Sequence, residues 1–140
     1  MLFRSVQNVP PTQTWDALKA TPEAQLVDVR TDAEWNFVGI PDLAEAGRQT
    51  VLIPWQIYPA MQRNEAFEDQ LKKTGFTSDN HIYFICRSGV RSLAAAQAAQ
   101  AVGFPHVYNV ADGFEGPPDA NGHRGATAGW KADGLPWRQK

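Results

Sequence analysis

The sequence predicts an α/β domain in which a mostly parallel central sheet is flanked by helices. Two short runs centred on apolar residues, 25–30 and 82–85, are typical of strands that are buried on both faces. Helix-forming segments alternate with these runs, which indicates right-handed βαβ crossovers between parallel strands. The chain has 140 residues, the length of one domain, and we assign residues 1–140 to a single domain.

The N-terminal third supplies the first of these elements. In order, we expect a short edge strand within residues 1–8, a helix from 12 to about 20, a strand at 25–30, a short helix from 31 to about 37, a polar loop at 42–49 and a strand at 51–53. Thr12 is the expected N-cap of the first helix. Thr31 and Glu34 have the spacing of a capping box at the start of the second. We also expect Arg30 to pair with Glu34 and to fix the turn between strand and helix.

The remaining elements lie after residue 58. In order, we expect an amphipathic helix at 59–73, a strand at 82–85, a helix from Ser92 that Gly103 and Pro105 end, a strand at 106–110 and a loop at 111–125. Met61, Phe67 and Leu71 mark the apolar side of the first helix. The loop has four glycines and two prolines, and either it walls a functional site, with Phe114 as the apolar contact, or it is a plain surface loop.

The one cysteine of the chain stands where the strand at 82–85 ends. Cys86 is followed by Arg87, Ser88, Gly89, Val90 and Arg91, and a helix begins directly afterwards. Backbone N–H groups at a helix N-terminus are unpaired and carry partial positive charge, and Gly89 can take the positive φ that turns such groups toward one centre. Together with two arginines, this setting favours a thiolate. Cys86 is therefore predicted to be a nucleophile, or a sulfur that carries a second sulfur.

Each of these residues also has a structural interpretation. A lone cysteine is most often a small buried hydrophobe, and arginines are most often solvated charges. The position of Cys86 at the end of the apolar run, rather than inside it, favours the reactive interpretation. We interpret His81, His106 and the five tryptophans as structural.

Composition excludes several classes of protein. A formal net charge of −2 does not favour nucleic-acid binding, and no apolar stretch is long enough to span a membrane. The first residues lack the pattern of a secretory signal, and a single cysteine suits a reducing compartment, so we expect a cytoplasmic protein. Asp119, Asn121 and His123 lack a fourth ligand, so we expect no metal.

Three stretches together resemble the single-domain rhodanese-like sulfurtransferases. The segment 86–92, CRSGVRS, resembles the active-site loop of that family. Residues 26–30, LVDVR, followed by Glu34-Trp35, resemble its early strand and its Asp-Val-Arg signature. Gly113-Phe114, Trp130 and residues 134–137, GLPW, resemble its C-terminal end, so the resemblance covers about residues 25–137. It implies a rhodanese-like three-layer domain. The chain departs from the family at Gly39, where a histidine usually precedes Ile-Pro, and in the added loop at 42–49.

The resemblance also implies an activity. Cys86 would take a sulfane sulfur from a small-molecule donor such as thiosulfate and pass it to a thiol or cyanide, with a sulfur-relay protein as a further candidate acceptor and with no cofactor. N–H groups of residues 87–91 would hold the terminal sulfur, and Arg87 and Arg91 would attract the donor. The alternatives are a binding or persulfide-carrier module without efficient turnover, and a Cys-dependent phosphatase or arsenate reductase. Four residues separate Cys86 from Arg91, one fewer than in the phosphatase relatives, which favours sulfur.

Overall fold

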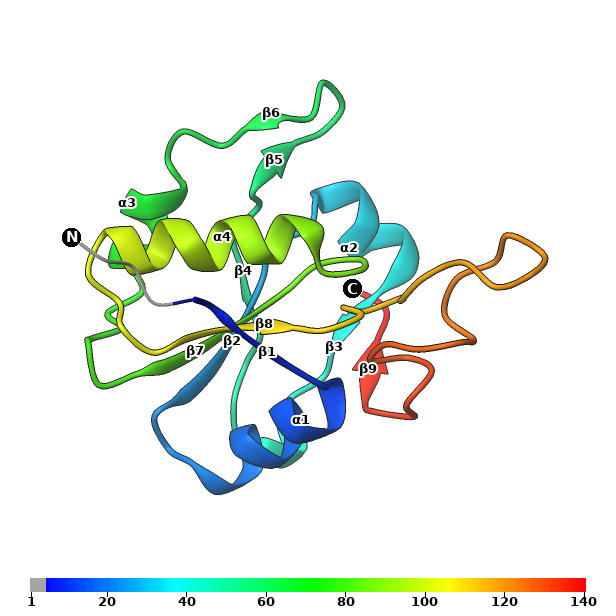
Figure 1. Ribbon diagram of the computed structural model, residues 1–140, viewed down its shortest axis with the longest axis horizontal. Helices are drawn as coiled ribbons and strands as arrows, with labels where there is room; N and C mark the ends of the chain where they lie inside the picture. Colours follow the sequence, from blue (N-terminus) through cyan, green and yellow to red (C-terminus); the bar gives the residue numbers. More distant parts are fainter. Residues whose placement is uncertain (1–4) are drawn as a thin grey trace.

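Five parallel strands form the central sheet of the computed structural model, which describes residues 5–140 (Figure 1). The strand order is β1-β8-β7-β2-β4, so β7 lies in the middle. The elements of the chain are β1 (Gln7–Val9), α1 (Pro11–Ala20), β2 (Ala24–Asp28), α2 (Asp32–Val38), β3 (Ile40–Pro41), the 3₁₀-helix η1 (Ala44–Ala46), β4 (Val51–Leu52), β5 (Gln56–Ile57), β6 (Gln62–Arg63), α3 (Phe67–Lys72), β7 (His81–Ile85), α4 (Val90–Ala101), β8 (Val107–Val110) and β9 (Trp137–Arg138).

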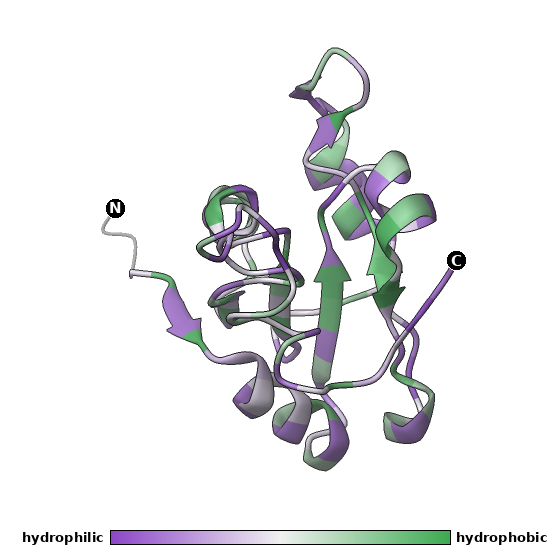
Figure 2. Ribbon diagram, turned by 90° about the vertical axis from the view of Figure 1, so that its right-hand side faces the viewer, coloured by the Kyte–Doolittle hydropathy of each residue, from purple (hydrophilic) through white to green (hydrophobic). Residues whose placement is uncertain are grey.

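The sheet separates two apolar clusters, which gives the three layers. Val27, Val29, Ile82 and Phe84 of the sheet pack with α3 and α4 on one face. Leu26, Tyr83 and Ile85 pack on the other face with α1, Phe114 and Trp130. Successive strand residues point to opposite faces, and the central strand β7 is largely hydrophobic, whereas the edge strand β1 is mostly hydrophilic (Figure 2). The predicted α/β fold, with a parallel sheet between helices, is confirmed.

The expected N-terminal edge strand forms, whereas the expected N-cap of the first helix does not. The edge strand is β1, which pairs with β8; residues 1–4 of the predicted range lie outside the described residues. Thr12 does not cap α1, since the helix begins at Pro11 and its N-cap, Pro10, makes no side-chain capping bond. The fixed φ of proline suits the first helical position, where no N–H partner is needed. The Thr31–Glu34 capping box at the start of α2 is confirmed.

The amphipathic helix expected at 59–73 is wrong for most of that range. Residues 56–63 form the hairpin β5–β6, and only Phe67–Lys72 is helical. Met61 has a φ of 57°, and its N–H donates to the carbonyl of Ile57 at 2.7 Å, so the chain turns back here instead of coiling. Phe67 and Leu71 are fully buried as the pattern indicated, whereas Met61 is 37% exposed.

The segment after β8 has no helix or strand until β9, as the glycine and proline content indicated. It is nonetheless anchored, because Phe114 and Trp130 are fully buried under the sheet. The polar loop expected at 42–49 contains η1 and one buried side chain, Leu43. Within residues 5–140, no helix has the length and apolar character needed to cross a bilayer.

Candidate active site

Cys86 lies at the carboxyl end of the central strand, where open parallel sheets place their ligands. The chain turns directly from β7 into α4, with Gly89 as the N-cap at φ 112° and ψ −7°. Only glycine takes such a φ without strain. The backbone N–H of Gly89 donates to the Cys86 sulfur at 3.1 Å, so the start of the helix is directed at the sulfur as the sequence predicted. The cysteine side chain is buried, at 1% exposure.

Ser92, Asn109 and Asn8 form a polar network that begins next to the Cys86 sulfur. Cys86 Sγ and Ser92 Oγ are 3.1 Å apart, and the Ser92 hydroxyl donates to Asn109 Oδ1. The Asn109 amide donates to the carbonyl of Gly89 at 3.1 Å and to Asn8 Oδ1 at 2.9 Å. These bonds fix the Asn109 amide orientation, because a carbonyl can only accept. The single Ser92 proton is thus engaged with Asn109, and a Cys86 thiol donates to Ser92.

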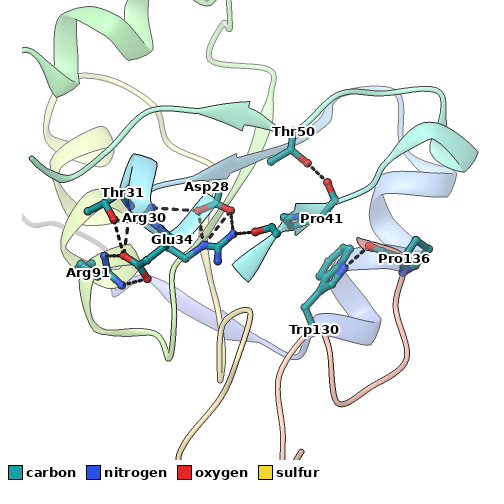
Figure 3. Close-up of polar contacts among 10 residues, drawn as sticks. Asp28, Arg30, Thr31, Glu34, Pro41, Thr50, Arg91, Trp130 and Pro136 are labelled. Carbon is teal, nitrogen blue, oxygen red and sulfur yellow. Dashed lines mark hydrogen bonds and ion pairs between the residues drawn. The ribbon is translucent and has the colours of Figure 1, made fainter. Parts of the chain in front are cut away.

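Arg91 lines the same cavity as Cys86, and its charge is paired with that of Glu34 (Figure 3). Its two terminal nitrogens donate to the two carboxylate oxygens of Glu34 at 2.6 and 2.9 Å. Burial alone would lower the pKa of Arg91, but the hydrogen bonds and charge of Glu34, then the charges of Cys86 and Asp28, raise it. Burial raises the pKa of Glu34, but the hydrogen bond and charge of Arg91 together lower it by more. The charge of Arg30 and a hydrogen bond from Thr31 lower this pKa further by smaller amounts.

The expected Arg30–Glu34 pair is therefore wrong. Arg30 instead pairs with Asp28, with Nη2 donating to Oδ2 at 2.7 Å, and both side chains are fully buried. The same nitrogen donates to the carbonyl of Gly39 at 2.7 Å, and the guanidinium lies 4.2 Å from the centre of the Phe114 ring. Asp28 and Arg30 share one side of the extended chain because side chains alternate, which places them within reach of each other (Figure 3). The pair ties the end of β2 to β3.

Backbone N–H groups near the start of the loop at 111–125 donate hydrogen bonds to the loop that begins with Cys86. The N–H of Phe114 donates to the carbonyl of Cys86 at 2.8 Å, and the N–H groups of Glu115 and Gly116 donate to that of Arg87 at 3.0 Å. Gly113 has a φ of 61°, and a Cβ there would overlap the carbonyl groups of Cys86 and Arg87. The Phe114 side chain does not line the cavity at Cys86, so its expected apolar contact with the sulfur site is wrong; the ring packs against Arg30.

A cavity of about 440 Å³ opens above Cys86 and brings most of the predicted residues together. It is lined by Cys86, Arg87, Ser88, Val90, Arg91, Glu34, Gln56 and Met61. Gly89 contributes through its N–H bond to the sulfur instead. Within residues 5–140, the Arg87 side chain makes no ion pair and no hydrogen bond, whereas the charge of Arg91 is compensated by Glu34.

Five residues of this site were not predicted from sequence patterns, and Gln56 and Met61 of the cavity lining are two of them. Ser92 shares a helix face with the buried Ala95, Ala96 and Ala99, a spacing that could have shown that it points inward. Asn109 is a polar residue within the otherwise apolar end of a strand, which is a usable signal for a buried polar contact. The second role of Glu34, as the partner of Arg91, has no local signal.

The geometry defines a class of protein: a parallel α/β domain that holds one buried cysteine sulfur at a helix N-terminus. The sequence matches the rhodanese-like domain family over residues 11–116, and the chain therefore belongs to that family. The family resemblance predicted from the CRSGVRS segment is confirmed.

Individual relatives agree with this assignment. The crystal structure of Rv0390 from M. tuberculosis superposes with a TM-score of 0.89 at 45% identity, and the match covers 98% of this chain and 100% of that one. The uncharacterised protein RC0915 of Rickettsia conorii is 38% identical over 135 residues, 96% of this chain and 98% of its own. The single-domain sulfurtransferase RDL2 of Saccharomyces cerevisiae, at 21% identity and a TM-score of 0.52 over 79% of this chain and 89% of that one, shares the fold.

Proposed function

We propose that this protein is a sulfurtransferase that moves a sulfane sulfur from a donor such as thiosulfate to a thiol or cyanide. The observation that carries the proposal is the setting of the Cys86 sulfur. It lies at the base of a cavity, accepts the Gly89 N–H at 3.1 Å and faces the N-terminus of α4. A helix N-terminus stabilises negative charge, and both a thiolate and a persulfide carry that charge on sulfur.

The reaction has two displacement steps. The Cys86 thiolate attacks the outer sulfur of thiosulfate, an S–S bond forms, the S–S bond of the donor breaks, and sulfite leaves with the electron pair. The acceptor thiolate or cyanide then attacks the terminal sulfur of the persulfide, and the electron pair of the broken S–S bond returns to Cys86. Both steps are covalent catalysis by one nucleophile, and the balance of atoms and electrons requires no cofactor.

The loop residues take distinct roles in this proposal. Arg87, exposed and without an ion pair among the described residues, attracts the anionic donor. Arg91 offers less attraction, because Glu34 compensates its charge. Ser88 and Val90 line the cavity. The N–H groups of residues 87–91 receive the terminal sulfur, and that of Gly89 donates to the Cys86 sulfur at 3.1 Å.

Steady-state kinetics test this proposal. With thiosulfate and dithiothreitol as substrates, a sulfurtransferase gives parallel double-reciprocal lines, since the sulfur resides on the enzyme between two half-reactions. A persulfide carrier would take up sulfur once and then fail to turn over. Release of sulfite only when both substrates are present, with intersecting lines, would contradict a Cys86 persulfide.

A further inference from the structure

Exposed apolar side chains lie on the segments that supply lining residues to the Cys86 cavity. Within residues 5–140, the structure exposes six large hydrophobic side chains, and five of them line the cavity or lie within three positions of a lining residue. These five, which we call the apolar rim, are Phe37 (84% exposed), Ile57 (47%), Tyr58 (60%), Met61 (37%) and Val90 (79%). Exposed apolar groups that gather around a functional site, rather than scatter singly, mark an interaction surface.

Two elements outside the sheet carry most of the rim. The ion pair between Glu34 and Arg91 holds α2 against the start of α4, and Phe37 stands one turn after Glu34 on the same side of α2. The hairpin β5–β6 projects from the body of the domain near α2 in both views (Figures 1 and 2). Gln56 and Met61 of this hairpin region line the cavity. Besides the start of α4, the rim is thus carried by two segments that supply lining residues to the cavity.

The dimensions of the site suit an acceptor larger than a free small thiol. The cavity of about 440 Å³ is in the range that holds a drug-sized ligand, far more than the five heavy atoms of thiosulfate require. Cys86 is only 1% exposed, so an acceptor sulfur must enter the cavity to reach it. A cysteine on a projecting chain segment can enter while its neighbours lie on the rim.

The charges at the mouth favour an acidic acceptor segment. The two charged groups Glu34 and Arg91 neutralise each other, at 2.6 and 2.9 Å. Arg87 is exposed and, in the described part of the chain, has no carboxylate partner. The mouth therefore presents one uncompensated positive charge in an apolar surround, and its complement is a carboxylate beside apolar side chains.

We propose that the apolar rim docks an acceptor protein, which presents a cysteine from an exposed segment with apolar neighbours and an adjacent carboxylate. The inference rests on the proposed sulfurtransferase function. The acceptor thiolate attacks the terminal sulfur of the Cys86 persulfide, the new S–S bond forms on the acceptor, and the electron pair of the broken bond returns to Cys86. The proton of the acceptor thiol goes to solvent.

The test compares two peptide thiols as acceptors. One nine-residue peptide has a single cysteine flanked by Leu, Phe and Asp; the other has Ser and Gly at those positions. Wild-type protein is loaded with thiosulfate, and transfer is followed by the masses of protein and peptide. The variants are Phe37→Ser with Ile57→Thr, and the matched control is Phe37→Leu with Ile57→Val, which keeps the surface apolar.

We expect the wild type to transfer to the apolar acidic peptide about tenfold faster than to the Ser/Gly peptide at limiting concentration. The Ser/Thr double variant should lose the part of that preference that comes from Leu and Phe while its transfer to cyanide stays unchanged, and the Leu/Val control should keep the full preference. Equal rates for the two peptides, or a preference that the Ser/Thr change leaves at full size, would overturn the inference. Normal transfer to cyanide in the same protein would leave the proposed function intact. A wild-type dimer that the Ser/Thr change dissociates would assign the rim to self-association instead. No persulfide in the wild type would overturn both proposals.

Discussion

Replacing Glu34 with glutamine separates the charge of this residue from its shape. In the wild type, Glu34 accepts two hydrogen bonds from Arg91 at 2.6 and 2.9 Å and one from the Thr31 N–H at 3.3 Å. The glutamine side chain has the same size and can still accept from Thr31 through its carbonyl oxygen. It cannot make the bidentate contact, since its amide nitrogen is a donor. The change therefore removes the countercharge of Arg91 and leaves α2 capped.

The structure sets the size of the expected loss. The side chains of Arg91 and Glu34 are 16% and 20% exposed, so the pair is intermediate between a solvated and a buried ion pair. A solvated pair contributes about 0–1 kcal/mol to stability, and disruption of a buried pair costs about 3–5 kcal/mol. We expect Glu34→Gln to lower the free energy of unfolding by about 1–3 kcal/mol near neutral pH. In a chain of 140 residues this corresponds to a fall in Tm of about 3–10 °C.

The loss should depend on pH. Arg91 lowers the pKa of Glu34 in the folded protein below its ordinary value of 4.5, although burial acts in the opposite direction. A carboxyl group with a lowered folded pKa contributes stability above its unfolded pKa and loses it as the pH falls through the folded value. The difference between wild type and Glu34→Gln should thus be constant at pH 6–8 and shrink below about pH 4.5.

Two assays follow this change. Urea unfolding at pH 7 and at a series of lower pH values measures the stability difference. If the proposed function holds, the uncompensated charge of Arg91 should also lower the KM for thiosulfate about fivefold, because one added unit charge contributes about 1 kcal/mol near the donor in water. A stability loss of the same size at pH 3.5 and pH 7 would refute the role given to the ion pair. An unchanged KM would refute the statement that Glu34 masks Arg91.

The other predictions concern the backbone and hydrogen bonds around the sulfur. Gly113→Ala should reduce sulfur transfer at least tenfold and destabilise the fold by about 2 kcal/mol, because the alanine Cβ would overlap the backbone of the cysteine loop. The control is Gly122→Ala, which should leave activity intact because Gly122 also has a positive φ, 79°, but has open space around it. Asn109→Leu removes the amide that accepts from Ser92 and donates to the carbonyl of Gly89, so sulfur transfer should slow; a variant as fast as the wild type would contradict the positioning role of Asn109. The wild type should hydrolyse aryl phosphates negligibly, and phosphatase activity that is lost in Cys86→Ser would overturn the assignment. One residue inserted after Gly89 should weaken sulfur transfer more than it lowers stability.

Local patterns predicted the parts of this protein that depend on near neighbours. The capping box of Thr31 and Glu34 and the strand–loop–helix around Cys86 follow from spacings of a few residues, and the structure has both. The Asp28–Arg30 pair could also have been predicted from the local sequence, since residues two apart in a strand point to the same side. An aspartate two positions before an arginine was a better candidate than Glu34, which lies on the following helix.

Long-range pairing explains what the sequence could not predict. Glu34 and Arg91 are 57 positions apart, and only the folded sheet brings α2 to the start of α4. Asn109 reaches Asn8 across 101 positions for the same reason. The helix expected from Pro59 failed because Met61 has the wrong spacing to Phe67 for one helix face, and the segment forms backbone bonds back to β5.

The mass of the protein after thiosulfate treatment tests the central claim most directly. Wild-type protein should gain the mass of one sulfur atom, and dithiothreitol should remove it. The variant Cys86→Ser, nearly isosteric and in the same buried position, should gain nothing while it unfolds in the same urea range. A wild type that never gains sulfur, or a Cys86→Ser variant that gains as much as the wild type, would contradict the account.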